Sequence, residues 1–291
     1  MEQVAFQELK RGGAGTWLWL VVFTMRNWFF SWTFFLPGFV LNVAGMFTTA
    51  AIFYLMGQLV AKGAEAHVAG YGLGYGAYIV TGVMFNLVMR TTLSAYHESC
   101  LRGYWATQYD TYLQHPGGVS ALLTGEVLAL YLIAAVNTLI YLLVGVWLFG
   151  VSVVVSSLVD VVVILILAIA ALTGLGLAGA STFSLLDAKR WGTNPVEWLV
   201  GFAVTLLAGV YFPPTVLPQW LQRLGELLPQ THALRAARLC LSGQATLADS
   251  TIAGDILFLV LFTLITLPIG VLLFAAGMRK AEREGSLTRW S

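Results

Sequence analysis

The sequence predicts an all-α membrane protein that crosses the bilayer several times. Of its 291 residues, 58% are hydrophobic and only 10% are charged, whereas about a quarter of the residues in an ordinary soluble domain are charged. The mean hydropathy is +0.81, and 15 Lys and Arg residues nearly balance 14 Asp and Glu residues. This composition excludes a soluble enzyme, gives no support to a nucleic-acid partner, and makes membrane lipid the expected environment.

Six apolar runs are long enough to be transmembrane helices, since a helix needs about 20 mainly apolar residues to cross the hydrocarbon core. Charged residues, Pro and Gly separate these runs. The expected spans are residues 34–60, 72–95, 119–149, 152–184, 196–212 and 252–277. No internal repeat or Pro/Ser-rich linker divides the chain, so we expect one membrane domain over residues 1–291.

A helix lying in the membrane interface is expected before the first span, at residues 15–32. This run is apolar but holds Arg26 and Asn27 near its middle, with Trp17 and Trp32 towards its ends. Tryptophan favours the headgroup level, and an arginine is far less costly there than at the bilayer centre. An orientation in the plane of the membrane is therefore favoured over a span.

The distribution of basic residues predicts that both termini are cytoplasmic, including a cytoplasmic tail at residues 278–291. The only Lys and Arg residues that this orientation leaves on the outer side are Lys62, Arg223, Arg235 and Arg238. Cys100 is then expected inside and Cys240 outside. The two cysteines cannot pair, and they form no metal-binding cluster.

Few ionisable residues fall within the predicted spans, and each is a functional candidate or an interfacial residue. We single out Arg90, Glu126, Asp160 and Asp255. Arg90 and Glu126 flank one cytoplasmic loop and can pair across it. The histidines His67, His97, His115 and His232 fall in predicted loops or at span ends. No metal site is predicted, and the residue sets of an intramembrane hydrolase are missing from the sequence.

The sequence contains no phosphate-binding P-loop, which requires a Gly-rich turn ending in Gly-Lys. None of its lysines, Lys10, Lys62, Lys189 and Lys280, follows a glycine. We therefore expect no cofactor in this chain, and any nucleotide-driven work must come from a partner.

The predicted inner loop at residues 97–118 mixes polar and aromatic residues at helical spacing. Tyr104 and Gln108 lie on one side, Trp105, Tyr109 and Tyr112 on another, before His115-Pro116-Gly117. This pattern predicts a short helix along the membrane, which is either a solvated loop helix or a docking element for a cytoplasmic partner.

The outer segment at residues 213–243 is interrupted by prolines and is too broken to cross the membrane. Its amphipathic pieces, 219–228 and 231–241, are predicted to be two helices that dip into the outer leaflet, because backbone at membrane depth must be helical or buried in protein. Arg223, Arg235 and Arg238 are expected to face water or headgroups.

At this segment the sequence resembles the membrane-spanning permease subunits of type 2 ABC exporters. The residues that carry the resemblance are Phe212-Pro213, Leu217-Pro218, Trp220, Leu228-Pro229, Thr231, Arg238 and Gly243. Glu98, Gly103, Leu113 and Pro116 resemble the family's segment between the second and third spans, and the tail at residues 279–290 also resembles family members.

The resemblance implies a multi-pass plasma-membrane protein, a homo- or heterodimer of permease subunits, and a separate ATP-binding subunit under each permease that holds ATP and Mg. It implies that the interfacial helix and the inner loop couple to that subunit and that the outer re-entrant helices close the exit. The coupling residues would be Glu98, Gly103, Tyr104, Trp105, Gln108, Tyr109, Tyr112, Leu113 and Pro116. The outer gate would be Phe212, Pro213, Pro214, Leu217, Pro218, Trp220, Pro229, Thr231 and Arg238.

The substrate is least specified by the sequence. An aromatic stripe of Tyr71, Tyr75 and Tyr78, with Phe53 and Tyr54 nearby, is either part of a substrate path or an interfacial aromatic belt. An apolar path suits export of a hydrophobic or amphipathic lipid or drug-like molecule, and a lipid-linked glycan or polysaccharide is the alternative. An ion-coupled secondary transporter, with Glu126 as its acidic residue, and a membrane enzyme are the rival classes.

Overall fold

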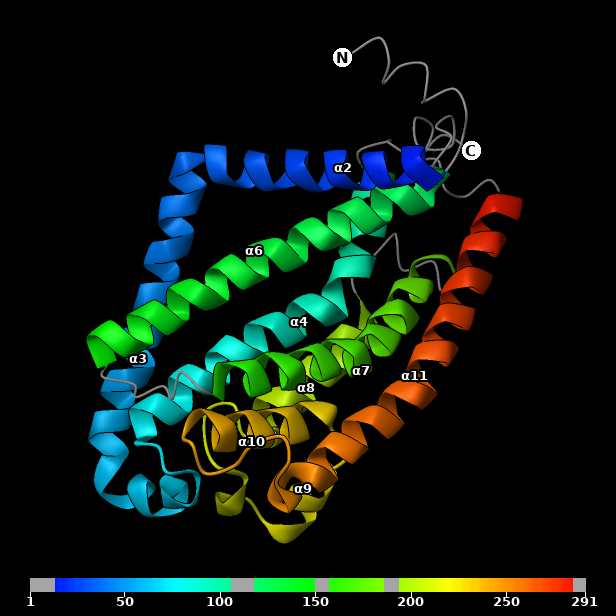
Figure 1. The fold of residues 1–291 in the computed structure, drawn as a ribbon. Helices are drawn as coiled ribbons and strands as arrows, with labels where there is room; N and C mark the ends of the chain where they lie inside the picture. Colours follow the sequence, from blue (N-terminus) through cyan, green and yellow to red (C-terminus); the bar gives the residue numbers. More distant parts are fainter. Residues whose placement is uncertain (1–13, 106–117, 150–156, 186–193, 285–291) are drawn as a thin grey trace.

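The structure, a computed structural model, describes residues 14–105, 118–149, 157–185 and 194–284 (Figure 1). Within these residues all regular structure is helical and no strand occurs, which confirms the predicted all-α class. The α-helices are α2 (Ala14–Phe34), α3 (Leu36–Val68), α4 (Tyr75–Trp105), α6 (Gly118–Phe149), α7 (Leu158–Leu185), α8 (Pro195–Leu207), α9 (Gln219–Gly225), α10 (Pro229–Leu241) and α11 (Ser250–Arg283). The 3₁₀ turns η1 (Ala69–Tyr71) and η4 (Pro214–Val216) lie among them in the described part of the chain.

Several of these helices are suited to a membrane. Among the described residues, α6, α7 and α11 are long and apolar enough to cross a bilayer, and α2 with Leu36–Thr49 forms a fourth, bent candidate. Most of the expected span at 72–95 lies in α4, which begins at Tyr75 and is not among these candidates. The expected span at 196–212 corresponds to α8, whose 13 residues extend only about 20 Å. The structure thus supports a membrane-embedded protein with fewer clear spans than the six predicted.

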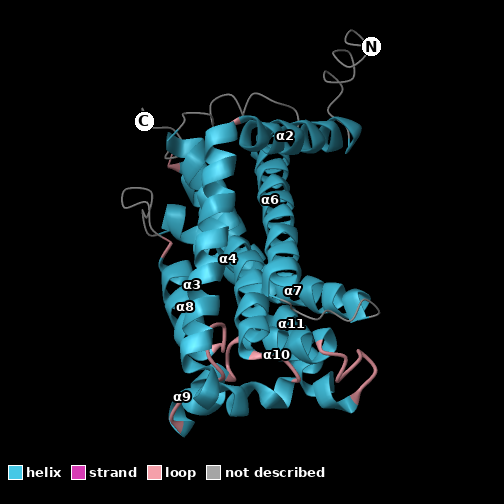
Figure 2. Ribbon diagram, turned by 90° about the vertical axis from the view of Figure 1, so that its left-hand side faces the viewer, coloured by secondary structure: helices cyan, strands magenta, loops and turns pink. Residues whose placement is uncertain are grey.

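A helix is present where the interfacial helix is expected, as α2, and the chain bends by 78° between α2 and α3. Phe35 separates the two helices, and Pro37 lies in the first turn of α3, where its missing N–H leaves no intrahelical hydrogen bond unmade. Leu20 and Val21 of α2 pack against Ala121 of α6. Figures 1 and 2 show α2 lying across one end of the helix bundle, which we name the α2 end.

The opposite end of the bundle is formed by η1, α9 and α10, and we name it the α10 end (Figures 1 and 2). The last turns of α11 return to the α2 end (Figure 1). The predicted outer helices and the predicted interfacial helix therefore lie at opposite ends of the molecule.

Helix α7 packs closely against α11 through small residues. A Cβ atom added to Gly270 would lie 2.1 Å from the carbonyl oxygen of Gly174, so the two backbones touch at this point. The Thr266 hydroxyl donates a hydrogen bond to the carbonyl oxygen of Ala171 across the same interface. Small residues and interhelical hydrogen bonds of this kind are typical of helix packing in membranes.

Two predicted boundaries are wrong. The predicted inner loop at residues 97–118 does not start at His97, because α4 continues through Trp105. No proline interrupts this part of the helix, and His97 and Gly103 are buried within it. The fifth predicted span ends at Leu207 rather than at residue 212, because Gly209 adopts a φ of 75° and turns the chain.

Candidate functional site

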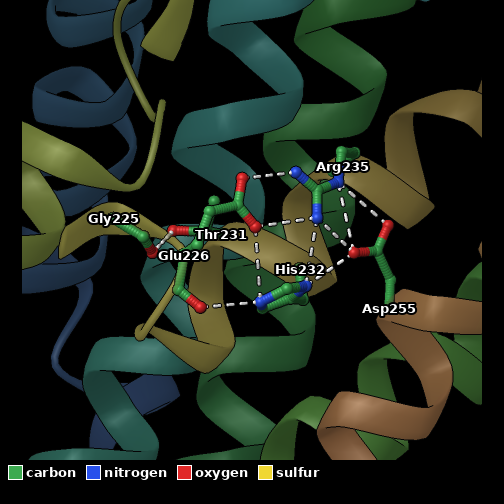
Figure 3. Close-up of polar contacts among 6 residues, drawn as sticks. All are labelled: Gly225, Glu226, Thr231, His232, Arg235 and Asp255. Atoms are coloured by element: carbon green, nitrogen blue, oxygen red, sulfur yellow. Dashed lines mark hydrogen bonds and ion pairs between the residues drawn. The ribbon is translucent and has the colours of Figure 1, made fainter. Parts of the chain in front are cut away.

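The segment between α8 and α11 folds as two short helices, as the sequence predicts. Helix α9 ends at Gly225, and Pro229 takes the first position of α10, where proline is favoured. The hydroxyl of Thr231 donates a 2.7 Å hydrogen bond to the carbonyl oxygen of Gly225 (Figure 3). This bond ties the start of α10 to the end of α9.

Helix α10 is more deeply buried than its amphipathic sequence predicts. It packs mainly against α7 and α11. Its small residues Ala233, Ala236 and Ala237 are all fully buried, as are Leu234 and Cys240. Helix α10 is therefore an integral part of the bundle and not a flap resting on its surface.

The expectation that Arg238 faces water or headgroups is wrong, since its side chain is only 2% exposed. Its Nη1 donates to the carbonyl oxygen of Gly209 at 2.8 Å, and its Nη2 donates to the carbonyl oxygens of Tyr78 at 3.0 Å and Val210 at 3.3 Å. Its Nε lies 3.4 Å from the Thr81 hydroxyl. Arg238 thus joins α10 to the start of α4 and to the turn after α8.

This position suits a cation because the carbonyl groups that follow a helix have no intrahelical donors and carry partial negative charge. Gly82, which has no side chain, lets the turn after α8 approach α4 closely. A Cβ atom at Gly82 would lie 2.1 Å from the carbonyl oxygen of Val210 and 2.5 Å from Nη2 of Arg238.

A second anchor is a cluster of charged side chains, Glu226, His232, Arg235 and Asp255 (Figure 3). Arg235 donates from Nη1 to Oε1 of Glu226 at 2.7 Å and from Nε to Oδ2 of Asp255 at 3.0 Å. Nδ1 of His232 lies 2.6 Å from Oδ1 of Asp255, and its Nε2 lies 2.9 Å from the carbonyl oxygen of Glu226. The cluster links the end of α9, helix α10 and the start of α11.

One side of the cluster is buried in the protein and the other is exposed to solvent. Asp255 is 5% exposed, whereas Glu226 is 48% exposed. The hydrogen bonds that Arg235 donates to the Asp255 carboxylate raise the pKa of the Arg235 guanidinium, so this residue stays charged. Asp255 was expected at the interface, and sequence reasoning missed its partners. A signal was present, because His232 and Arg235 are three residues apart and therefore share one face of α10.

The predicted outer-gate residues gather at the α10 end. Pro213, Pro229 and Thr231 are buried there with Arg238. Phe212, Pro214 and Leu217 are half-buried, and Pro218 and Trp220 are exposed. A small cavity of about 120 Å3 lies between the two anchors, with Tyr71, Thr215 and both Arg235 and Arg238 in its wall.

The tyrosines predicted for a substrate path lie against the same anchors. Tyr78 is fully buried, and its hydroxyl donates a 2.8 Å hydrogen bond to the carbonyl oxygen of Gly209. Tyr75 donates more weakly to the carbonyl oxygen of Tyr211 at 3.3 Å. Tyr71 is half-buried, and its ring centroid lies 5.4 Å from that of Tyr78. The side chains of Phe53 and Tyr54 lie outside the described residues.

The predicted coupling residues are only partly described. Glu98, Gly103, Tyr104 and Trp105 occupy the last turns of α4 at the α2 end. Trp105 is 47% exposed, whereas the ring of Tyr104 packs edge-on against Phe183 of α7. The remaining residues, Gln108, Tyr109, Tyr112, Leu113 and Pro116, lie outside the described residues.

The predicted pairing of Glu126 with Arg90 is wrong, because Glu126 faces Arg102 instead. Oε2 of Glu126 lies 3.9 Å from Nε of Arg102, and the Arg102 guanidinium lies 4.2 Å from the ring centroid of Trp28. These contacts join α6, α4 and α2 at the α2 end. Arg90 is twelve residues earlier in α4, about 18 Å along the helix, and it is exposed.

A comparison of the chain with known protein-family models and with curated proteins finds no match.

Proposed function

We propose that this chain is the permease subunit of an ATP-driven exporter that moves a hydrophobic or amphipathic substrate, such as a lipid or a drug-like molecule. The observation that carries this function is the α9–α10 segment, which stands between α8 and α11 at the end opposite α2. The sequence of this segment is the part of the chain that resembles the permeases of type 2 ABC exporters. Its fixation by Arg238 and by the charged cluster supports a role as the outer closure.

In this proposal α3, α4, α6, α7, α8 and α11 are the six spans, and both termini are cytoplasmic in the plasma membrane. The short α8 reaches only part of the bilayer thickness, and α9 and α10 complete the protein at the α10 end. Backbone at that depth is acceptable because α10 is helical and buried between α7 and α11. Helix α2 then lies in the cytoplasmic interface, with its exposed aromatic residues among the headgroups.

The chain works as the moving part and not as the ATPase. Separate subunits bind ATP and Mg, one under each of two permease subunits, and meet the α2 end through Trp105 and the segment that follows it. ATP closes these subunits, and their motion shifts the permeases between an inward-accepting and an outward-releasing state. The driving free energy is the difference in nucleotide affinity between the two states.

A second candidate is an ion-coupled carrier, because Glu126 is a buried carboxylate about two turns into the third predicted span. Its proximity to Arg102, at the α2 end of the bundle, favours a structural ion pair. Export of a lipid-linked glycan or polysaccharide differs from the main proposal only in the substrate.

The test is affinity purification of the tagged full chain from its native membrane in mild detergent, with mass spectrometry and an ATPase assay. We expect an ATP-binding subunit in equal amount and vanadate-sensitive hydrolysis. A chain that purifies alone and without ATPase activity contradicts the proposal.

A variant pair locates the coupling surface. Trp105→Ala should uncouple ATP hydrolysis from transport, because this exposed side chain ends α4 at the α2 end. Trp147→Ala is the control, since Trp147 is 91% exposed near the other end of α6. Equal coupling in both variants would remove Trp105 from the coupling surface.

A further inference from the structure

Arg90 is a charged side chain without a hydrogen-bonded partner among the described residues, and it lies halfway along α4. It lies twelve residues from Tyr78 and twelve from Arg102 in α4, which is about 18 Å of helix in each direction. These two residues belong to the contacts at the α10 end and the α2 end. Within the described part of the chain, Arg90 makes no hydrogen bond or ion pair. A charge on a membrane-spanning helix is costly and is normally turned towards a partner or a polar cavity.

Arg90 faces a groove of about 450 Å3 between α4 and α8, which we name the α4–α8 groove. Glu197, in the first turn of α8, lines the same groove, without an ion pair to Arg90 within the described residues. Trp198 and Phe202 line its apolar part. These two side chains are 75% and 65% exposed, and their rings are stacked.

The polar end of the groove is held in place by backbone contacts. Asn194 caps α8 by accepting a hydrogen bond from the backbone N–H of Glu197, and its amide donates to the carbonyl oxygen of Leu93 in α4. Asn194 is 6% exposed. The distance between the Glu197 turn and α4 is therefore fixed by the same residue that begins α8.

The groove offers an anion-binding group, an acidic group and an adjoining aromatic surface. A guanidinium binds phosphate well, and a carboxylate binds an ammonium group. Exposed aromatic rings accept an acyl chain. The occupant with this charge arrangement is a zwitterionic amphiphile, with a phosphate and an ammonium group on one head and an apolar tail.

We infer that the α4–α8 groove binds the head group of a zwitterionic phospholipid-like substrate, with its phosphate on Arg90, its ammonium on Glu197 and its tail along Trp198 and Phe202. This assignment rests on the proposed function, whose substrate it specifies. On the proposed orientation, the head group lies between α4 and α8 while the tail stays in lipid. The charges of Arg90 and Glu197 replace part of the hydration that the head group loses.

The test measures lipid binding to the purified full chain in detergent, by native mass spectrometry with added phosphatidylethanolamine or phosphatidylglycerol. Arg90→Gln should weaken binding of both lipids about tenfold, the factor that roughly one charge-assisted hydrogen bond supplies. Glu197→Gln should weaken binding of phosphatidylethanolamine only, because phosphatidylglycerol has no ammonium group. Equal binding of both lipids by the wild type and both variants overturns the assignment.

Gly201 supplies a variant that fills the groove without disturbing the fold. It lines the groove, and a Cβ atom added there would meet nothing within 4 Å. Gly201→Leu should abolish binding of both lipids. Gly254→Leu, at an equally open position on α11, is the control and should bind normally. Unchanged lipid binding by Gly201→Leu contradicts the proposed site.

Two further measurements test the role of the lipid tail and the presence of a second copy in the groove. Free phosphoethanolamine should bind far more weakly than the lipid, because it lacks the tail, and equal binding would exclude the aromatic surface from the site. If Gly201→Leu changes the mass of the assembly from dimer to monomer, a second copy covers the groove and the lipid assignment is wrong.

Lipid binding is measured on the permease without its ATP-binding subunit. Failure of this test and failure of the ATPase test are therefore distinct outcomes.

Discussion

The guanidinium of Arg238 lies 3.5 Å from the ring centroid of Tyr78, and both residues donate a hydrogen bond to the carbonyl oxygen of Gly209. One backbone oxygen thus receives a donor from α10 and a donor from α4. The turn after α8 is held between them. Any opening of the α10 end must either break these contacts or move α10, α4 and the turn after α8 as one unit.

Replacement of Arg238 should strongly destabilise the chain. Arg238→Ala removes the Arg238 donor from the buried carbonyl oxygen of Val210 and leaves that of Gly209 with the Tyr78 hydroxyl alone, and an unsatisfied buried group costs about 1–3 kcal/mol. Arg238→Lys should recover only part of the loss, because an ammonium lacks the planar fork of donors. Thermal unfolding in detergent measures both effects.

The matched control for this prediction is Arg223→Ala. Arg223 is exposed on α9, so its loss should leave the unfolding temperature nearly unchanged. Equal stability of the Arg238→Ala and Arg223→Ala variants would show that the buried arginine is not an anchor.

The charged cluster should depend more on Asp255 than on Glu226. Asp255→Asn removes a buried carboxylate that faces both Arg235 and His232, and breaking a buried pair costs on the order of 3 kcal/mol. Glu226→Gln should cost less than about 1 kcal/mol, since this side chain is half exposed and screened by water. Asp160→Asn, outside the cluster, is the control.

A double-mutant cycle with Asp255→Asn and Arg235→Gln isolates the interaction within the cluster. Because the two side chains are in direct contact, we expect their effects on unfolding to be non-additive. Additive effects would indicate that the two side chains stabilise the chain independently.

Gly82 should not tolerate even the smallest side chain. In Gly82→Ala the added Cβ would meet the carbonyl oxygen of Val210 at 2.1 Å, so the turn after α8 must move away from α4. We expect a lower unfolding temperature. Gly45→Ala, where a Cβ meets nothing within 4 Å, should be neutral or slightly stabilising. Similar unfolding temperatures for the two variants would contradict this close packing.

The sequence predicts the helices well because apolar length and proline positions are local properties. The two prolines after Phe212, with Pro218 and Pro229, predict the break into α9 and α10 before any tertiary contact is known. The sequence predicts a span that ends at residue 95, but α4 continues beyond it. The composition changes there from apolar to mixed, and such a change indicates where a helix leaves the membrane and not where the helix ends. Helix α4 continues through Trp105 in spite of that change.

The partners of the charged residues could not be derived from the sequence alone. Arg90 and Glu126 flank the same predicted loop, but α4 extends further, so Arg102 is the residue that reaches Glu126. The burial of Arg238 depends on the turn at Gly209, whose carbonyl oxygen replaces the water that an exposed arginine would bind. Such contacts depend on how helices pack, and one sequence contains no direct record of that packing.

Thiol labelling tests the orientation, but the native cysteines are poor probes. Cys100 and Cys240 are both buried, and burial raises the pKa of the Cys240 thiol to about 11. Since the thiolate is the reactive form, roughly one thiol in a thousand is reactive at pH 8. We therefore expect no rapid labelling of Cys240 in the folded chain, even with a reagent added on the outer side, where the sequence predicts this residue to lie.

Introduced cysteines should report the two sides. Trp220→Cys, at an exposed position on α9, should react with an impermeant maleimide on intact cells. Glu284→Cys, at the end of α11, should react only after the membrane is opened. The reverse pattern would invert the proposed topology.

Glu126 distinguishes an ATP-driven permease from an ion-coupled carrier. In the permease, Glu126→Gln loosens the contact with Arg102 that joins α6 to α4, and we expect only a modest fall in ATP-driven transport in membrane vesicles. A carrier that used this carboxylate to bind a proton would lose transport completely, because glutamine cannot titrate. The same vesicles with a protonophore provide the second readout. Complete loss in the variant, together with collapse of wild-type transport by the protonophore, would exclude the ATP-driven permease.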